Sequence, residues 1–262
     1  MSTRRRLEAL AALAAGALLA LSASASASPT LRFKAEPFPI TGFPHTGYIL
    51  GAGTALGAEY SISGNEYGGF PPPLIGVNVY FPAGAQVHPA GFPTCSKAVL
   101  ERSGPRACPA GSAAGPVGQA RGIVAFGDER VEETTTVESF YAPGGGLEFF
   151  TTGHTPVSLE ILSSGHYVQL HGAGGYGLEL VTEVPLVSTV PGADYASVEF
   201  ISVEAGSAYR SHGRSFYYGT LPPSCPADGF AVKTEAIFDR GGAVPEVPEP
   251  VTVSYRAPCP RK

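Results

Sequence analysis

Glycine and proline occur so often in this sequence that long helices are excluded. The chain of 262 residues contains 34 Gly and 25 Pro, or 59 residues together, whereas average usage would give roughly 12% of the chain. Both residues destabilise the interior of a helix. Hydrophobic residues still make up 44% of the chain, which is enough for a packed core. The composition therefore predicts a turn-rich β protein.

Short alternations of apolar and polar residues recur between Gly/Pro turns, as in Leu31, Phe33 and Ala35, and this pattern is typical of strands. Residues 130–141, rich in Thr and Glu, are expected to form an edge strand. The single helix expected is a short one at 96–101. The strands expected are 31–35, 60–62, 77–81, 117–126, 130–141, 147–152, 156–162, 166–171, 178–184, 197–204, 215–219, 229–238 and 250–256.

Evenly spaced short strands favour an all-β, antiparallel β-sandwich fold of the immunoglobulin-like kind with minimal helix. The length exceeds what one such sandwich needs, so we predict two domains, residues 28–128 and 129–262, with one sandwich as the alternative. The boundary follows the strand that ends at Phe126, and it gives each half one pair of cysteines.

Residues 1–27 have the parts of a secretory signal peptide. Arg4, Arg5 and Arg6 form a basic start, residues 9–21 are apolar, and residues 25–27 read Ala-Ser-Ala, a small-residue cleavage site. The apolar stretch is shorter than the roughly 20 residues of a membrane-spanning helix, so an uncleaved anchor is the weaker alternative. We expect a secreted or cell-envelope protein without membrane insertion after cleavage. The general secretory and twin-arginine routes both remain open.

The chain contains four cysteines, Cys95, Cys108, Cys225 and Cys259. An even number of cysteines in an exported protein predicts disulfide bonds. Three pairings are possible, and sequence order favours Cys95–Cys108, which closes a local loop, with Cys225–Cys259, which holds the ends of the last hairpin. A zinc site is disfavoured because no C-x-x-C motif or nearby His pair accompanies the cysteines.

The net charge disfavours two classes of partner. The whole chain carries 17 basic and 22 acidic residues. Removing three Arg and one Glu with the signal peptide leaves 14 and 21, a net charge of −7. An acidic protein has no electrostatic attraction to nucleic acid or to anionic membranes. We therefore expect the partner to be a protein or a cell-surface polymer.

Several segments carry a resemblance to known proteins: residues 74–84, 93–95, 108–112, 223–225 and 257–260. In these segments the chain resembles a group of exported β-rich proteins of unknown function from high-GC bacteria. The resemblance implies a secreted β fold, and it implies no particular chemistry.

Catalytic motifs are weakly represented. Residues 172–177 match G-x-G-x-x-G, but residues 178–184 alternate as a strand, whereas a dinucleotide site needs a helix there. A hairpin turn is therefore predicted. No G-x-S-x-G element occurs, the Asp residues lie at turns, and His154, His166 and His171 are expected to be ordinary partly exposed side chains. We predict no catalytic residue, cofactor or metal site.

Paired carboxylates offer the alternative of a glycan-directed hydrolase, because retaining glycosidases use two carboxylates on neighbouring strands. The candidate pairs are Glu160 with Glu179, and Glu179 with Glu183. The competing interpretation is that Glu148, Glu160, Glu179, Glu183 and Glu199 cover the solvent face of the sheet. The absence of Trp, which would stack on sugars, favours this second interpretation.

The best candidate for partner binding is a proline-rich loop containing Tyr67, Phe70, Pro71, Pro72 and Pro73. Its prolines restrict the unbound chain, so less entropy is lost on contact, although packing of the loop on its own domain would explain the same residues. We therefore predict a non-catalytic extracellular interaction module. A third alternative is a β-barrel for a small ligand, which an enclosed apolar cavity would favour.

Overall fold

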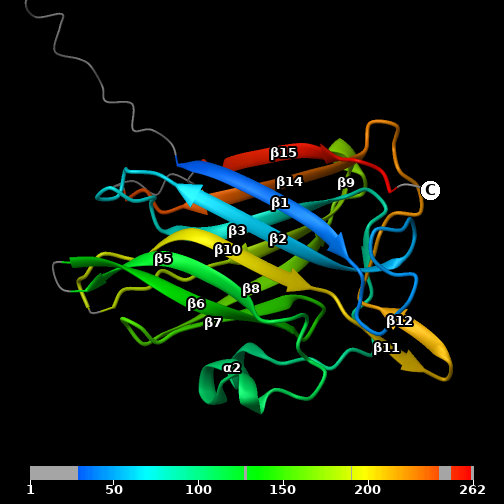
Figure 1. Ribbon diagram of the computed structural model, residues 1–262, viewed down its shortest axis with the longest axis horizontal. Coiled ribbons are helices and arrows are strands. Elements are labelled where there is room, and N and C mark those ends of the chain that lie inside the picture. The colour runs from blue at the N-terminus through cyan, green and yellow to red at the C-terminus, as the bar shows by residue number, and fades with distance from the viewer. Residues whose placement is uncertain (1–28, 127–128, 190, 242–248, 261–262) are drawn as a thin grey trace, which may run out of the picture.

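The structure is a computed structural model that describes residues 29–126, 129–189, 191–241 and 249–260 (Figure 1). The expected signal peptide, residues 1–27, lies outside the described residues, as does residue 128 at the predicted domain boundary. In the part of the chain that is described, no helix has the length and apolar character needed to span a membrane.

Strands dominate the described chain, as the composition predicts. One α-helix, α2 (Lys97–Ser103), and two single turns of 3-10 helix, η1 (Pro105–Ala107) and η2 (Ala173–Gly175), accompany them. The strands are β1 (Thr30–Phe38), β2 (Gly53–Ser63), β3 (Leu74–Pro82), β4 (Gln86–Val87), β5 (Gly118–Phe126), β6 (Glu129–Tyr141), β7 (Leu147–Gly153), β8 (Leu159–Gln169), β9 (Tyr176–Glu183), β10 (Ser197–Ala205), β11 (Ala208–Ser211), β12 (Arg214–Tyr217), β13 (Gly219–Thr220), β14 (Phe230–Phe238) and β15 (Val251–Ala257).

Most strands belong to one antiparallel sheet. They are hydrogen-bonded in the order β15-β14-β3-β9-β8-β7-β6-β5-β10-β2-β13-β4, and β1 pairs with β2 along its whole length. Strands β11 and β12 form a separate hairpin, which projects from one end of the molecule (Figure 1).

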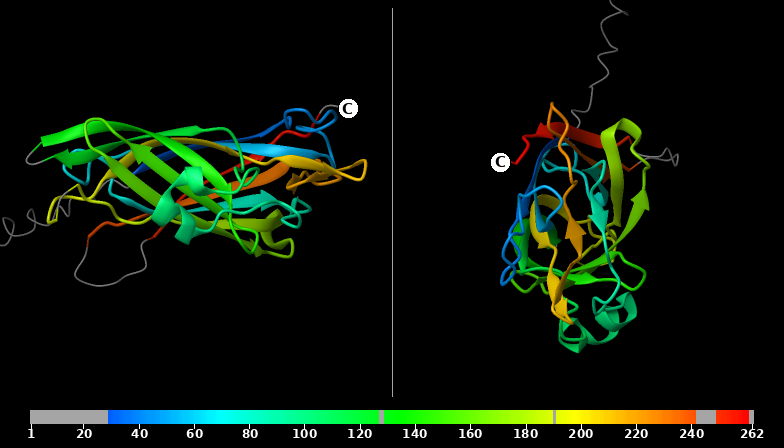
Figure 2. Two further views of the ribbon diagram at one scale, coloured as in Figure 1. Left: turned by 90° about the horizontal axis from the view of Figure 1, so that it is seen from below. Right: turned by 90° about the vertical axis from the view of Figure 1, so that its right-hand side faces the viewer.

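The sheet folds over on itself, so the all-β, antiparallel sandwich expected from the sequence is confirmed. Strands β2, β10, β5 and β6 line one side of the interior, and β3, β9, β8 and β7 line the other. Figure 2 shows the two edges of the sheet, β1 and β15, brought side by side. The Tyr255 hydroxyl of β15 bridges them, because it accepts a hydrogen bond of 2.8 Å from the Ala35 amide of β1.

Strands from the two predicted halves of the chain are interleaved. Strand β3 lies between β9 and β14, and β10 lies between β2 and β5. Residues 28–128 and 129–262 therefore do not form separate sheets, and immunoglobulin-like connectivity is not confirmed. Short strands between Gly/Pro turns have the same local pattern in one large sheet as in two small ones. Which strands pair across long distances in the chain decides between one large sheet and two small ones. The local alternation of residues does not specify this pairing.

Two predicted strand details are corrected. Strand β6 is not an edge strand, because it pairs with β5 on one side and β7 on the other. Residues 163–165, expected to form a turn, lie inside β8, where Ser163 pairs with Phe149 and Gly165 pairs with Leu147. Gly165 is buried against Leu180, so this glycine provides close packing and not a turn. The predicted turn at 172–177 is confirmed, since it joins β8 to β9.

The helix α2 covers the outer face of the sheet beside β6 and β7. Its Leu100 is 1% exposed and packs with Phe140 and Phe150. The Cys95–Cys108 disulfide closes the loop that carries this helix. The Cys225–Cys259 disulfide joins the chain before β14 to the chain after β15. Both pairings confirm the prediction from sequence order, and both fit an oxidising environment.

Aromatic side chains fill one end of the interior. Tyr141 stacks on Tyr218 with ring centroids 4.0 Å apart, and Phe92 packs edge-on against the two rings at 5.2 and 5.3 Å. Both tyrosine hydroxyls are hydrogen-bonded at 2.8 Å, Tyr141 with the Ser207 hydroxyl and Tyr218 with the Gly145 carbonyl. We call this group of rings the aromatic cluster.

Candidate functional site

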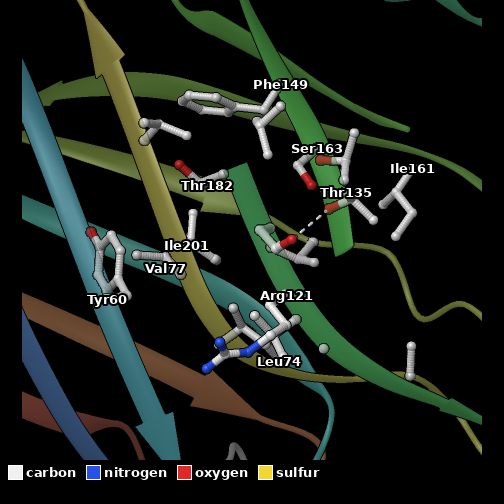
Figure 3. Close-up of a pocket in the computed structure, with 18 of the residues that line it drawn as sticks. Tyr60, Leu74, Val77, Arg121, Thr135, Phe149, Ile161, Ser163, Thr182 and Ile201 are labelled. Carbon is white, nitrogen blue, oxygen red and sulfur yellow. Dashed lines mark hydrogen bonds between the residues drawn. The ribbon is translucent and has the colours of Figure 1, made fainter. Parts of the chain in front are cut away.

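An apolar cavity of about 180 Å³ lies inside the sandwich (Figure 3). We call it the interior cavity. Figure 3 shows Phe149, Thr182, Ile201 and Val77 surrounding this space from different strands. Its apolar walls come from both sides of the folded sheet and include Tyr60, Leu74, Val77, Val79, Val124, Val137, Phe149, Ile161, Leu180, Ile201 and Val203. An engineered cavity of roughly 150 Å³ with similar walls takes up benzene, so this space has the size of a small apolar ligand.

Small residues keep the cavity open. Ala58 of β2, Ala120 and Gly122 of β5 all line it. Gly122 packs so closely against β10 that a Cβ atom there would collide with the carbonyl oxygen of Ser197. Close approach of β5 and β10 therefore requires glycine at this position, and the same residue leaves the adjacent wall without a side chain.

Five of the polar residues that line the cavity among the apolar ones are buried: Glu133, Thr135, Ser163, Thr182 and Ser197. Thr135 satisfies its hydroxyl by donating to the Ala120 carbonyl at 3.2 Å, as the dashed line in Figure 3 shows. A mostly apolar pocket with a few polar groups is the usual form of a small-molecule site.

Glu133 is the most unusual of these residues, because its carboxylate is 1% exposed. Its two oxygen atoms accept hydrogen bonds from the backbone N–H groups of Thr155 at 3.3 Å and Val157 at 3.1 Å. Gly153 lies so close that a side chain there would collide with the carboxylate. Within the described ranges, no Lys, Arg or His forms an ion pair with Glu133. The carboxylate thus holds the β7–β8 turn without a counter-charge.

Ser197 lies on the other side of β5 from Glu133. The register pairs Glu133 with Gly122, and Ser197 with the adjacent Ile123. Ser197 is 1% exposed, and its hydroxyl has no hydrogen-bond partner among the described residues. A buried hydroxyl without a partner is costly. Because side chains alternate between the two faces along a strand, this register places the Glu133 and Ser197 side chains on opposite faces of the sheet at this end of the interior cavity.

Two smaller cavities continue the interior cavity toward the aromatic cluster. The middle cavity, of about 120 Å³, shares Val79, Phe149 and Leu180 with the interior cavity. The far cavity, of about 70 Å³, shares Phe81 and Tyr167 with the middle cavity. Burial raises the pKa of Tyr167, so its hydroxyl stays neutral. The three cavities form a row.

A surface pocket of about 220 Å³ adjoins the opposite end of the interior cavity. We call it the vestibule; it is lined by residues 124–125, 157–160, 187–189, 194 and 196. It shares Val124, Leu159 and Ala196 with the interior cavity. Its charged residues are Glu160, which is exposed, and Asp194, which forms an ion pair with Arg130. The vestibule is therefore the natural route between solvent and the interior cavity.

The predicted partner-binding loop lies beside the vestibule segment. The guanidinium of Arg130 lies 5.0 Å from the Tyr67 ring centroid and 5.7 Å from that of Phe70, and the Tyr195 amide donates to the Tyr67 hydroxyl at 2.9 Å. Both aromatic rings are partly exposed, whereas Pro71, Pro72 and Pro73 are buried. The prolines hold the loop in place and offer no contact surface, and partner binding through the loop stays a prediction.

The carboxylates proposed for hydrolysis are not brought together as pairs. Strand register places Val168 opposite Glu179, and Glu160 lies eight residues before Val168, which is roughly 26 Å along the strand. Glu179 and Glu183 lie on one strand, roughly 13 Å apart. The pKa of Tyr80 is raised, first by burial and then by Glu235 and Glu179. These three side chains lie on β3, β9 and β14, away from the residues that line the cavities.

The remaining candidates are placed at turns and on the surface. His154 and His166 are exposed, and His171 lies in the turn after β8 with a φ of 52°. Among the residues that the structure describes, no group of three or more His, Cys, Asp or Glu side chains is arranged to hold a metal ion.

Neither Glu133 nor Ser197 is a site residue predicted from the sequence. Glu133 stands in a Thr- and Glu-rich strand whose composition resembles a solvent face. A signal was present in the alternation of Glu133, Thr135 and Val137 along a strand that ends with the apolar Phe140 and Tyr141. This alternation places Glu133 on the core side of the strand.

Comparison with known proteins adds no relative: no protein-family model matches the sequence, and no curated protein or solved structure matches it.

Proposed function

We propose that this protein is an exported, non-catalytic carrier that binds a small apolar molecule inside its β-sandwich. The observation that carries the proposal is the interior cavity of about 180 Å³ with its apolar walls. Enclosing an apolar molecule removes its surface from water, which stabilises the complex by about 25 cal/mol per Å². This function specifies the ligand class of the interaction module predicted from the sequence.

The surroundings of the cavity support binding over catalysis. Glu133 is occupied in holding two backbone N–H groups, and the Ser197 hydroxyl is hydrogen-bonded to no base among the described residues. A nucleophile requires an adjacent base for activation. Location outside the cytoplasm is part of the proposal; the two disulfides and the signal-like N-terminus support it.

The test is to fill the cavity. Ala58 lines both the interior and the middle cavity, so Ala58→Leu places extra carbon atoms where the ligand would lie. The ligand then loses burial worth about 0.8 kcal/mol per displaced CH₂, and we expect its affinity to fall about tenfold or more. Ala98→Leu, at an exposed position on α2, is the matched control.

Binding is measured by fluorescence of an environment-sensitive naphthalene dye, with decanol as the competitor. The expected result is saturable binding with one dye per protein, displacement by decanol, and loss of both only in Ala58→Leu. Absence of saturable binding, or equal affinity of the wild-type protein and Ala58→Leu, would refute the proposed function.

A further inference from the structure

We propose that the ligand is a linear amphiphile with a cationic amine head, and that Glu133 binds this head while the apolar chain extends along the row of cavities. This inference rests on the proposed function, since it names the class of molecule that the interior cavity takes.

The buried carboxylate of Glu133 selects for a cation. A carboxylate has about four acceptor positions, and the N–H groups of Thr155 and Val157 occupy two of them. Burying a charge is costly unless it is both paired and hydrogen-bonded. Since no basic side chain pairs with Glu133 in the described chain, an ammonium group from a ligand supplies the missing charge.

Ser197 does not share the head with Glu133. Gly122 pairs with Glu133 and with Val198, whereas Ser197 pairs with the adjacent Ile123. Side chains alternate between the two faces along a strand, so the Ser197 hydroxyl lies on the opposite face of the sheet from the Glu133 carboxylate. An alkylammonium carries three N–H donors, and those at the head therefore reach the free acceptor positions of Glu133.

The same walls disfavour an anionic head such as a carboxylate. Arg121 is the single Lys, Arg or His among the described residues that line the three cavities. Its side chain is exposed and directed to the acids Glu132 and Glu199, at 3.7 and 3.8 Å. A fatty acid would therefore bring a second negative charge beside Glu133 without a cation to neutralise it.

The approach to the cavity has the same sign. Glu160 and Asp194 line the vestibule. Asp194 is paired with Arg130, so Glu160 supplies the negative charge there. Acidic walls raise the local concentration of cations at the entrance of a cleft. The head group thus meets carboxylates both at the surface and at Glu133.

The row of cavities fits an extended chain. Along β10, Val198 and Ile201 line the interior cavity, Val203 lines the interior and middle cavities, and Ala205 lines the middle and far cavities. Val198 is level with Glu133, since both pair with Gly122, and from Val198 to Ala205 the strand advances seven residues, or roughly 23 Å. A linear chain with its head at Glu133 therefore passes through successive apolar spaces toward the aromatic cluster.

The test compares three ligands that share one chain and differ in the head: decylamine, decanol and decanoate. Isothermal titration calorimetry on the purified protein, below the concentrations at which these molecules form micelles, gives the three affinities. A charge-assisted hydrogen bond is worth more than a neutral one, so decylamine is expected to bind about tenfold or more tightly than decanol. Decanoate is expected to bind most weakly.

Variants assign the preference to the head-group site. Glu133→Gln is expected to bring the affinity for decylamine down to that for decanol, while decanol binding changes less than about threefold. Ser197→Ala, on the opposite face of the sheet, is expected to leave decylamine binding unchanged. The matched controls are Glu59→Gln and Ser61→Ala, exposed positions on β2, and both should bind all three ligands like the wild-type protein.

The outcomes separate this inference from the proposed function. If decanol binds as tightly as decylamine, or if Glu59→Gln lowers amine binding as much as Glu133→Gln does, the head-group inference is wrong and the carrier function stands. If none of the three ligands binds, the carrier function fails as well. Should Glu133→Gln not fold, because Glu133 holds the β7–β8 turn, the three ligands on the wild-type protein decide: decanoate binding as tightly as decylamine overturns the inference.

Discussion

The two ends of the sandwich interior are filled in opposite ways. At one end Tyr141, Tyr218 and Phe92 pack ring against ring, with both hydroxyls hydrogen-bonded. At the other end Gly122 and the surrounding small residues leave a cavity of about 180 Å³. The same strands, β6 among them, run through both ends. One sheet can therefore combine a tightly packed region that stabilises the fold with an open region that is free to bind.

The polar groups show the same difference. In the aromatic cluster each buried hydroxyl of Tyr141 and Tyr218 has a partner, as folded proteins normally require. At the cavity end Ser197 has none within the described chain, and Glu133 has hydrogen bonds but no counter-charge. Under the proposed function, the uncompensated charge of Glu133 is what a bound ligand would pair.

The largest effect should come from removing a ring of the aromatic cluster. Tyr141 is 1% exposed, so Tyr141→Ala is expected to lower the free energy of unfolding by about 3–5 kcal/mol. Ile201→Ala beside the interior cavity should cost about 2 kcal/mol, because some neighbours of Ile201 are already missing. Urea unfolding measures both. Equal losses at the two positions would mean that the two ends are packed alike.

A smaller effect should appear in the pH dependence of stability. Burial raises the pKa of Tyr141 to about 12, whereas an unfolded tyrosine has a pKa of about 10. Between these values the unfolded chain has released its proton and the folded protein has kept it. The contribution of Tyr141 is therefore complete below pH 10 and is lost by about 1.4 kcal/mol per pH unit as pH rises toward 12.

The variant Tyr141→Phe tests this pH dependence directly. Near neutral pH it should cost about 1 kcal/mol, because the Ser207 hydroxyl loses its partner. Above pH 10 the free energy of unfolding of this variant should fall less steeply with pH than that of the wild-type protein. The difference in slope is about 1.4 kcal/mol per pH unit, which is the contribution of one proton. Urea unfolding at several pH values gives both slopes, and identical slopes would contradict the assignment of this titration to Tyr141.

The smallest effect is expected where a buried hydroxyl has no partner. Ser197→Ala removes a costly polar group, so the unliganded protein should keep its stability or gain up to about 1 kcal/mol. Ser112 is the matched comparison, since it is 0% exposed and its hydroxyl donates to the Pro109 carbonyl at 2.7 Å. Ser112→Ala should cost about 1 kcal/mol. Thermal unfolding compares them, and a larger loss for Ser197→Ala would show that its hydroxyl already has a structural role.

Local patterns in the sequence predicted local structure well. The alternation of Val77, Val79 and Phe81 marks β3, and the turn at 172–177 joins β8 to β9 as expected. Cysteine order predicted both disulfides. Each of these features depends on residues close in the chain, so turn chemistry and periodicity determine them.

Strand order and the site could not be predicted in the same way. That β3 pairs with β14 depends on register between residues far apart in the chain, which no local alternation specifies. The cavity depends on the combined volumes of side chains from facing strands. Glu133 has the residue type of a solvent face, and the β7–β8 turn, with Gly153 against the carboxylate, is what covers it.

The position of β3 in the sheet determines when the fold can be completed. Its Val77 pairs with Thr182 of β9 on one side and Ala236 of β14 on the other. Strand β3 can therefore be paired on both sides only after β9 and β14, which come much later in the chain, have been synthesised. Contacts between distant segments slow folding, because the entropy of closing a long loop is lost before the contacts form. A chain with this strand order cannot complete its sheet until nearly all of it is present. This suits the proposed export, in which a polypeptide crosses a membrane unfolded and folds afterwards.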